Sequence, residues 1–491
     1  MINLDKSYIA IDLGAGSGRV ILGSFGDKRL DLHIVHRFPN EIQEIDGHLR
    51  WNTKRLFEDI KVGLRKIASM NLNVVSLGVD TWGVDYGLFD AEGNLLEEPV
   101  CYRDRRTTGA MKEVFKAISK EDIFRKTGSQ FLPINTLYQI FAQRKRGEWP
   151  KKAARLLMMP DIFHFYLTGS RVGEFTMATT TQLLNTTKKI WDADLFHKLD
   201  IPLDVMPKLL QPGQQIGILL PKLQKELNMP AIKIVAPATH DTASAVVGTP
   251  LRPGWGYISS GTWSLVGIET RSPIMNNNAF RYNFTNEGGA FGSNRFLKNV
   301  MGLWILERCR EQWRARNELL EYDLLIEKMK ESPSLQTFIN PDDVRFLNPA
   351  DMIGEIRTYL HDTGQQATDD QIGLSKIILE SLAMRYAAIF AEIQEQTGEK
   401  LQGIHIIGGG SQNDFLNQAT ANATGLQVIA GPVEATAIGN LMVQAIANGR
   451  FPDMQKARDY IASMIPLKKY VPEVTRVWRE AFKRYRNRLG V

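Results

Sequence analysis

The sequence predicts an α/β protein made of two duplicated domains around a central cleft, and three observations support this. The chain has 491 residues, 43% hydrophobic and 23% charged, which is typical of a globular protein. This length favours about two or three domains of roughly 150 to 250 residues, each able to bury its own core. Short apolar runs that end in loops alternate with helical patterns, and one kind of glycine-turn hairpin occurs twice.

The first hairpin is predicted between residues 8 and 25. The apolar run YIAI leads to DLGAGSGR at 12–19 and then to VILGSF, which indicates strand, glycine turn and strand. The glycines allow a tight turn whose backbone N–H groups can hold a phosphate. A dinucleotide-binding GxGxxG is excluded because Arg19 stands at its last glycine and a strand follows, and no GxxxxGK[ST] loop occurs.

The second hairpin is predicted between residues 257 and 268, where YISSGTWS leads into LVGI. Each half of the chain therefore opens with a hairpin whose turn could face a phosphate. The turn-rich stretch TPLRPG at 249–254 separates the halves. We expect an N-terminal domain over residues 1–249 and a C-terminal domain over residues 250–491.

Three further buried strands are predicted at 74–79, 232–236 and 404–407, and a helical face repeats between Leu374 and Ile393. Each of these strands ends in a loop. Ligands of α/β sheets bind at the carboxyl ends of strands, so these loops are where we expect a site.

Two of the loops allow two interpretations each. Residues 408–413, GGGSQN, offer bare backbone against which a flat ring could lie, or they form only a tight turn from strand to helix. Residues 80–85, DTWGVD, surround one aromatic ring with polar groups, as sugar sites do, or they form only a hairpin whose aspartates suit turn geometry.

The third loop, PATHDTASAVV at 237–247, contains the candidate catalytic residue Asp241. The alternative role of this residue is to cap the small-residue helix that follows. A His240–Asp241 hydrolase dyad is disfavoured because no GxSxG nucleophile turn is present. His33 and His36 lie on a strand-like segment without a third metal ligand.

Composition disfavours several other classes of protein. Cys101 and Cys309 are the only cysteines, so neither a disulfide framework nor a zinc site is expected. No apolar run approaches the roughly 18 residues of a membrane span and no signal segment precedes the first strand, so we expect a cytoplasmic protein without a membrane partner. The net charge of +6 is small for a nucleic-acid binder.

Two basic runs, at 144–155 and 476–488, fall on helical patterns. In the second, Trp478, Phe482 and Tyr485 recur at helical spacing, which predicts a terminal helix that docks an aromatic stripe and leaves its basic face in water. We therefore expect no nucleic-acid partner.

The motifs together resemble those of the FGGY carbohydrate kinases, and the resemblance runs from Tyr8 to about Gly449. It implies two domains of the actin and hexokinase type, with a ribonuclease H-like fold. The segments that carry it are DLGAGSGR at 12–19, GVDTWGVD at 78–85, YRDRR at 102–106, QFLPINTLYQ at 130–139, ATTTQL at 178–183, THDTASAV at 239–246, SSGTWSL at 259–265, NEGG at 286–289, LKNVMGLW at 297–304, GGGSQN at 408–413 and AGPVEAT at 430–436.

The resemblance also implies roles for individual residues. Asp241 would be the proton acceptor, and the sugar contacts would be Gly83, His240, Thr242 and Asn299. The ATP contacts would be Ala15, Gly16, Ser17, Gly18, Arg19, Thr262, Glu307 and Gly409, with glutamate at 307 where some relatives have glutamine. Mg²⁺ is expected with ATP, and Asp12 is its candidate ligand because Mg²⁺ uses one or two carboxylates beside phosphate and water.

The implied reaction is ATP-dependent phosphorylation of L-rhamnulose at O1, by a monomer or small homo-oligomer. Alternatives are a kinase of the same family for L-fuculose or xylulose, or a sugar sensor that binds without transferring phosphate. Loss of the base would be the simplest signature of a sensor, and Asp241 is present.

Overall fold

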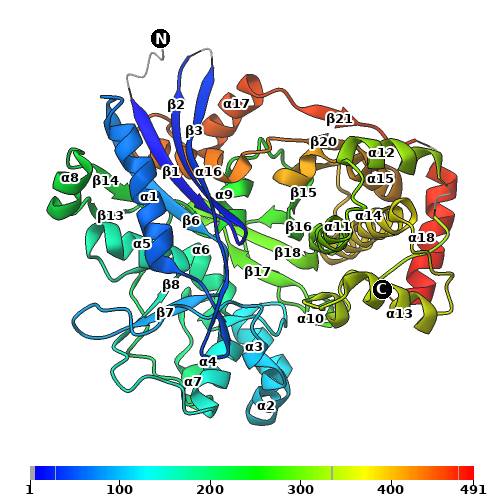
Figure 1. The fold of residues 1–491 in the computed structure, drawn as a ribbon, viewed down its shortest axis with the longest axis horizontal. Helices are drawn as coiled ribbons and strands as arrows, with labels where there is room; N and C mark the ends of the chain where they lie inside the picture. The colour runs from blue at the N-terminus through cyan, green and yellow to red at the C-terminus, as the bar shows by residue number, and fades with distance from the viewer. Residues whose placement is uncertain (1–5, 28, 333–334, 474, 491) are drawn as a thin grey trace. The chain divides into compact units, whose positions relative to one another are not determined.

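The computed structural model describes residues 6–27, 29–332, 335–473 and 475–490. Residues 1–5 lie outside the described residues, and the expectation that no signal segment precedes the first strand concerns this part of the chain. The chain forms two compact units (Figure 1). Unit 1 contains Met1–Pro250, Glu269–Phe296 and Ala435–Ile465, and unit 2 contains Leu251–Ile268, Leu297–Glu434 and Pro466–Val491.

Unit 1 is built on a six-stranded sheet of order β13-β14-β6-β1-β2-β3. β1, β6 and β14 are parallel neighbours, whereas β1, β2 and β3 are successive antiparallel strands. The predicted first hairpin is confirmed, because Leu13 pairs with Gly18 across the turn between β1 and β2. The strands are β1 (Ser7–Leu13), β2 (Ser17–Phe25), β3 (Leu30–Pro39), β6 (Val74–Thr81), β13 (Gln215–Ile218) and β14 (Lys233–Val235).

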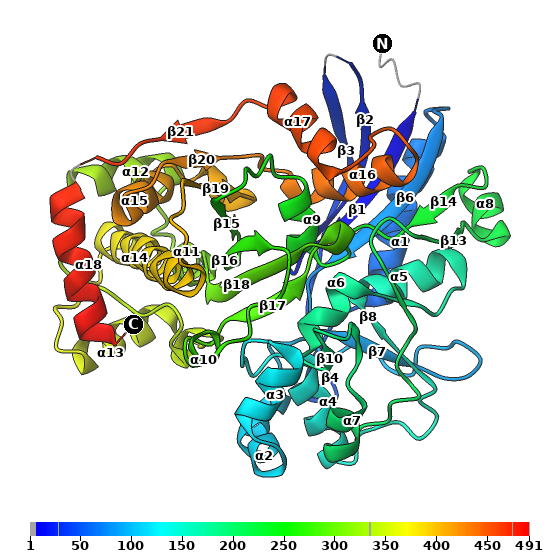
Figure 2. The same ribbon diagram turned by 180° about the vertical axis from the view of Figure 1, so that it is seen from behind.

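Helices cover both faces of this sheet, with α1 (Thr53–Ala68) on one face and α16 (Ala435–Ala447) on the other (Figures 1 and 2). The contacts are close: an added Cβ at Gly63 of α1 would lie 2.6 Å from Val20, and one at Gly23 would lie 2.4 Å from Leu441 of α16. Both glycines therefore let helix and sheet pack tightly.

The helix that begins at Asp241, α9 (Asp241–Val247), is held by α16 at backbone distance. An added Cβ at Gly248 would lie 2.1 Å from the carbonyl oxygen of Ala435, and one at Gly439 would lie 1.7 Å from that of Ser244. α16 is anchored to the sheet by Gln444, which donates to the carbonyl of Ile9 at 2.9 Å. Gly248 at the end of α9 and Gly439 of α16 therefore allow a close helix crossing that holds α9 against α16.

The other helices of unit 1 are α2 (Ala110–Ala117), α3 (Lys120–Thr127), α4 (Thr136–Lys145), α5 (Met159–Thr168), α6 (Phe175–Ala178), α7 (Ala193–Lys198), α8 (Pro221–Leu227), α10 (Asn277–Arg281) and α17 (Met454–Met464). Its short strands are β4 (Gln43–Ile45), β5 (His48–Arg50), β7 (Tyr86–Phe89), β8 (Arg155–Met158), β9 (Gly173–Glu174), β10 (Leu184–Asn185), β11 (Ile190–Trp191), β12 (Leu209–Leu210) and β17 (Thr285–Gly288).

Unit 2 repeats the pattern of unit 1: β15 pairs with β16 as an antiparallel hairpin and with β19 as a parallel neighbour. The predicted second hairpin is thereby confirmed, and so is the α/β class. The strands of unit 2 belong to a seven-stranded sheet of order β17-β18-β16-β15-β19-β20-β21. By the chain limits given above, β17, the start of β18 and the end of β16 are counted with unit 1. The strands not yet given are β15 (Trp255–Ser260), β16 (Trp263–Thr270), β18 (Asn294–Met301), β19 (Gly403–Ile407), β20 (Val428–Ala430) and β21 (Lys468–Tyr470).

The predicted helical face at 374–393 lies within α14 (Gln371–Thr397), a long buried helix of unit 2. The other helices are α11 (Trp304–Ala315), α12 (Tyr322–Glu331), α13 (Met352–Asp362), α15 (Asp414–Thr424) and α18 (Thr475–Leu489). The aromatic stripe predicted on α18 is confirmed, because Trp478, Phe482 and Tyr485 join one apolar cluster with Met384 of α14. Within the described part of the chain, no helix combines the length and apolar character needed to cross a membrane.

Candidate active site

The parallel strands of unit 1 bring the loop that contains Asp241 to the end of the first hairpin. Asp12 of β1 lies opposite Asp80 of β6 in the parallel register. One residue further on, Thr81 forms a parallel bridge with His240. The loop after β14 therefore runs beside the end of β6 and places Asp241 at the carboxyl ends of the strands.

Asp241 is the first residue of α9, and the N-cap position is held by His240. The Asp241 Oδ1 atom accepts a hydrogen bond from the backbone N–H of Thr242 at 2.5 Å and another from the Thr242 hydroxyl at 3.1 Å. The His240 Nε2 atom lies 3.5 Å from the same oxygen, and the Asp241 side chain is 30% exposed. The carboxylate is thus held by its neighbours and still accessible to a ligand.

Three carboxyl groups of unit 1 influence one another electrostatically. Burial raises the pKa of Asp241, His240 opposes this effect, and the charge of Asp12 reinforces it. Burial, followed by the charge of Asp12, raises the pKa of Asp80 well above its ordinary value. Asp12 itself forms an ion pair with Arg19 of β2. The three groups therefore differ: Asp12 is compensated by Arg19, Asp80 is deeply buried, and Asp241 is accessible.

The turn of the first hairpin presents open backbone at one glycine and packs tightly at another. The Gly14 N–H donates to the Ser17 carbonyl at 2.9 Å. An added Cβ at Gly16 would meet nothing within 4 Å, whereas one at Gly18 would lie 2.3 Å from the ring of Phe38. A ligand can therefore approach the backbone at Gly16, whereas at Gly18 the packing of the Phe38 ring leaves no room for a side chain. The other predicted phosphate contacts here, Ala15, Ser17 and Arg19, are partly exposed.

The loop after β6 is held by a buried carboxyl group. Asp85 Oδ2 accepts from the indole N–H groups of Trp51 at 2.7 Å and Trp82 at 3.0 Å. Trp82 is only 5% exposed and its ring centroid lies 4.3 Å from that of Trp51. The interpretation of Trp82 as an open platform for a sugar ring is therefore not favoured. Gly83, a predicted sugar contact, is partly exposed in the same loop.

In unit 2, the turn of the second hairpin is fixed by the start of α11. The carbonyl of Thr262 accepts the N–H of Gly302 at 3.0 Å. An added Cβ at Gly302 would lie 2.7 Å from the carbonyl oxygen of Gly261, so this approach requires glycine. Glu307 lies in the first turn of α11 with an exposed side chain. Thr262 and Glu307, both predicted ATP contacts, thus belong to adjacent elements.

The triple-glycine loop lies against the end of β15 in the same unit. An added Cβ at Gly410 would lie 2.0 Å from the Ser260 hydroxyl, and one at Gly408 would lie 3.0 Å from the Ser260 carbonyl. At Gly409 the same atom would meet nothing within 4 Å. The loop then enters α15, whose N-cap is Asn413. It is therefore a tight strand-to-helix turn that also leaves open backbone at Gly409.

The predicted sugar contacts fall in both units. Gly83 follows the end of β6, and His240 and Thr242 flank Asp241, so these belong to one region of unit 1. Asn299 is on β18 in unit 2.

Two charged residues that face His240 were not predicted from the sequence. Glu287 Oε2 lies 3.2 Å and Arg295 Nη2 lies 3.1 Å from His240 Nδ1. Glu287 belongs to the NEGG segment, which contributed to the family resemblance without receiving a role. An acidic residue beside two glycines on a short strand was the available signal.

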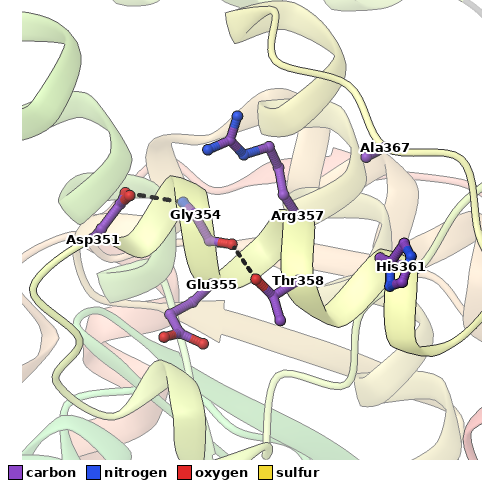
Figure 3. Close-up of a pocket in the computed structure, with 7 residues that line it drawn as sticks. All are labelled: Asp351, Gly354, Glu355, Arg357, Thr358, His361 and Ala367. Atoms are coloured by element: carbon purple, nitrogen blue, oxygen red, sulfur yellow. Dashed lines mark hydrogen bonds between the residues drawn. The ribbon is translucent and has the colours of Figure 1, made fainter.

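A cavity of about 620 Å³ is formed by α13 and the loop that follows it in unit 2 (Figure 3). None of the sequence-predicted site residues lines it. The lining residues are Asp351, Gly354, Glu355, Arg357, Thr358, His361 and Ala367.

The described residues contain no group of three or more His, Cys, Asp or Glu side chains arranged to hold a metal ion. Cys101 and Cys309 are both buried and free. Several charges of the first basic run form ion pairs, including Lys145 with Glu113 at 2.7 Å and Arg146 with Glu148 at 3.0 Å.

The fold belongs to the class of two-domain carbohydrate kinases. A xylulose kinase from Lactobacillus acidophilus superposes with a TM-score of 0.82 at 16% identity, covering 99% of each chain. A glycerol kinase from Plasmodium falciparum, solved with ADP, gives a TM-score of 0.75 at 13% identity, covering 99% of this chain and 97% of that one. Because the identities are low, these two similarities establish the fold alone.

The chain belongs to the FGGY family of carbohydrate kinases. The N-terminal domain model of the family matches residues 7–248 and the C-terminal domain model matches residues 256–448. A rhamnulokinase of Bacteroides thetaiotaomicron is 41% identical over 486 residues, 99% of each chain. A rhamnulokinase of Bacillus subtilis is 40% identical over 467 residues, 95% of each chain.

Proposed function

We propose that the protein transfers the γ-phosphoryl group of ATP to O1 of L-rhamnulose, giving L-rhamnulose 1-phosphate and ADP. The observation that carries the proposal is Asp241, an accessible carboxylate at the carboxyl ends of parallel strands, with His240 beside it. The relatives named rhamnulokinase, at about 40% identity over nearly the whole chain, support the choice of sugar. Because the reaction consumes ATP, we infer a cytoplasmic location.

Asp241 would act as the general base. It accepts the proton of the O1 hydroxyl while this oxygen forms a bond to the γ-phosphorus, and the bond from that phosphorus to the β,γ-bridging oxygen breaks with its electron pair leaving on ADP. The transition state is loose, so a strong base is unnecessary. Burial raises the pKa of this carboxylate, which makes it a better proton acceptor when it is ionised.

The remaining residues would bind the two substrates. We propose that Gly83, His240, Thr242 and Asn299 contact the sugar. ATP would be contacted by Ala15, Gly16, Ser17, Gly18, Arg19, Thr262, Glu307 and Gly409. A domain of residues 1–249 would then carry the phosphate hairpin, most of the sugar contacts and the base. A domain of residues 250–491 would complete the nucleotide site with Thr262, Glu307 and Gly409 and would add Asn299 to the sugar contacts.

The donor set at the end of β1 fits a magnesium ion that arrives with ATP. Such an ion takes most of its ligands from phosphate and water and needs only one or two carboxylates. Asp12 would supply one, directly or through water, and its present partner is Arg19. When bound, Mg²⁺ neutralises charge on the phosphoryl oxygens.

A coupled ADP-release assay with Mg-ATP and a panel of L-rhamnulose, L-fuculose and D-xylulose tests the proposal. The highest kcat/KM is expected for L-rhamnulose. A clear preference for xylulose would overturn the choice of sugar. Sugar binding measured by calorimetry without ADP release from any ketose would favour the sensor alternative.

A further inference from the structure

A buried ion pair lies next to the Nδ1 atom of His240, whereas the Nε2 atom of the ring is the one near Asp241. Arg295 of β18 and Glu287 of β17 are both in unit 1 and are joined by a contact of 2.9 Å between Nη2 and Oε2. Their side chains are 1% and 5% exposed, and that of His240 is 8% exposed. The Arg295 Nε–H also donates to the Gly288 carbonyl at 3.0 Å, which fixes the plane of the guanidinium.

The contacts of the imidazole ring restrict where its proton can be. Arg295 Nη2 lies 3.1 Å from His240 Nδ1, and a guanidinium can only donate, so Nδ1 accepts when this bond forms. Glu287 Oε2, at 3.2 Å from Nδ1, is the competing acceptor, but its charge is compensated by Arg295 at 2.9 Å. Nη2 carries two hydrogens, so Arg295 can donate to Glu287 and to Nδ1 together. A neutral ring that accepts at Nδ1 must have its hydrogen on Nε2.

The other nitrogen leads to the same assignment. Nε2 lies 3.5 Å from the Asp241 carboxylate, which can only accept when ionised. A ring protonated only at Nδ1 would turn a lone pair toward this oxygen, and an imidazolium would add a positive charge beside the Arg295 guanidinium. Two further carboxyl groups, Asp12 and Asp80 on the neighbouring strands, interact electrostatically with Asp241. A third, Glu174, accepts the backbone N–H of Thr239, the residue before His240.

We propose that Arg295, held by Glu287, fixes His240 as the neutral tautomer with hydrogen on Nε2, so that this N–H is presented beside Asp241 as a donor to a sugar oxygen. The use of that donor rests on the proposed function, whereas the tautomer itself does not. Arg295 and Glu287 are positioning residues, because they act on the sugar only through His240. Their role explains why an acidic residue in the NEGG segment is buried next to the catalytic loop.

The tautomer can be measured directly by two-bond ¹H–¹⁵N correlation spectra of protein labelled with ¹⁵N-histidine. The chain has 8 histidines, and the His240 signals are assigned by their loss in His240→Gln. In the wild-type protein we expect Nε2 to be protonated and Nδ1 to be unprotonated. A protonated Nδ1 would overturn the inference, and this measurement requires no destabilised variant.

Two substitutions test what sets the tautomer. In Arg295→Met the Arg295 donor to Nδ1 is lost while Glu287 remains, so Nδ1 should become protonated. In Glu287→Gln, Arg295 still donates and Nδ1 should remain unprotonated. The reverse pattern would show that Glu287 rather than Arg295 sets the ring state. If Arg295→Met does not fold, the wild-type and Glu287→Gln spectra still decide.

A matched control is available within unit 1. Arg458 is also buried, binds Glu269 at 2.7 Å and the Val246 carbonyl at 2.9 Å, and faces no histidine in these contacts. Arg458→Met should therefore lower stability as Arg295→Met does but leave the His240 spectrum unchanged. A similar spectral change in both variants would indicate a general loss of packing and reject the inference.

Kinetics separate this inference from the proposed function. Arg295→Met should lower kcat/KM for L-rhamnulose by about 10- to 100-fold, as expected for a lost buried hydrogen bond, with KM for ATP changed less than about threefold. Arg295→Lys, which keeps a charged donor, should recover part of the loss. If the wild-type enzyme is inactive on L-rhamnulose, the choice of sugar is refuted but the inference about His240 is not. The spectra would still show which ring nitrogen is protonated.

Discussion

The turn of the first hairpin contains two glycines that should respond in opposite ways to the same added methyl group. At Gly16 the new Cβ would meet nothing within 4 Å, and the residue is not among those with positive φ. Gly16→Ala should therefore fold as the wild-type protein does. Because the proposed phosphate contact requires close approach to this backbone, the methyl group should instead weaken ATP binding.

The expected size follows from the contacts that would be lost. A hydrogen bond from backbone N–H to a charged oxygen contributes about 1.5 to 3 kcal/mol, and a methyl group in the path of the phosphate removes at least one such bond. Each 1.4 kcal/mol corresponds to a factor of about ten in affinity. We therefore expect Gly16→Ala to raise the Kd for ATP by about 10- to 100-fold, with sugar affinity unchanged.

Gly18→Ala is the matched control. Its Cβ would lie 2.3 Å from the Phe38 ring and 2.8 Å from the Leu13 side chain, so the hairpin must shift. Overpacking of this kind lowers stability by about 1 to 3 kcal/mol. Isothermal titration with ATP and thermal unfolding of both variants provide the comparison. Unchanged ATP affinity in a folded Gly16→Ala protein would refute phosphate binding at this turn.

Three further predictions concern the base and the second hairpin. Asp241→Asn should lower kcat by about 10²- to 10⁴-fold, because the amide cannot accept the proton, while titration shows sugar and ATP binding unchanged; near-normal turnover would reject Asp241 as the base. Because burial raises the pKa of Asp241 and the base must be ionised, kcat/KM should fall as the pH falls through a value above the ordinary 3.8; an acid limb at or below 3.8 in the pH profile would contradict this. Gly302→Ala would bring its Cβ within 2.7 Å of the Gly261 carbonyl oxygen, so scanning fluorimetry should show Tm lowered by about 2 to 10 °C, and an unchanged Tm would show that this approach is not needed.

Local signals were sufficient to predict the two hairpins and the buried parallel strands beside them, but not β13, β17, β18, β20 and β21, which complete the sheets. The hairpins were visible because glycine turns separate two apolar runs, and the strand expected at 74–79 is observed as Val74–Thr81. The long-range return of Ala435–Ala447 to pack on α9 and the sheet could not be predicted in this way. This helix is apolar or small on most of its surface, so its sequence does not indicate which neighbours it contacts.

Asp241 was singled out because it follows a strand and begins a helix, where it could act as a base or as a helix cap. The N-cap position is held by His240 and the Asp241 carboxylate is accessible, and its role as the base stays a prediction. The place of Trp82 could not be predicted locally: a tryptophan among aspartates resembles a sugar platform, but Asp85 accepts its indole N–H and holds the ring in the interior. Arg295 was missed because its partners, Glu287 and His240, are brought to it by folding and not by sequence spacing.

The electrostatics of the three neighbouring aspartates support the proposal that Asp241, rather than Asp12 or Asp80, is the base. Three carboxylates at the ends of adjacent strands would repel one another if all were ionised without compensation. Asp12 is compensated by Arg19, and its side chain is only 6% exposed. Asp80 is 0% exposed, and burial together with the charge of Asp12 raises its pKa, which favours its protonated form. Asp241, at 30% exposure, is left as the carboxylate that can both ionise and reach a sugar hydroxyl.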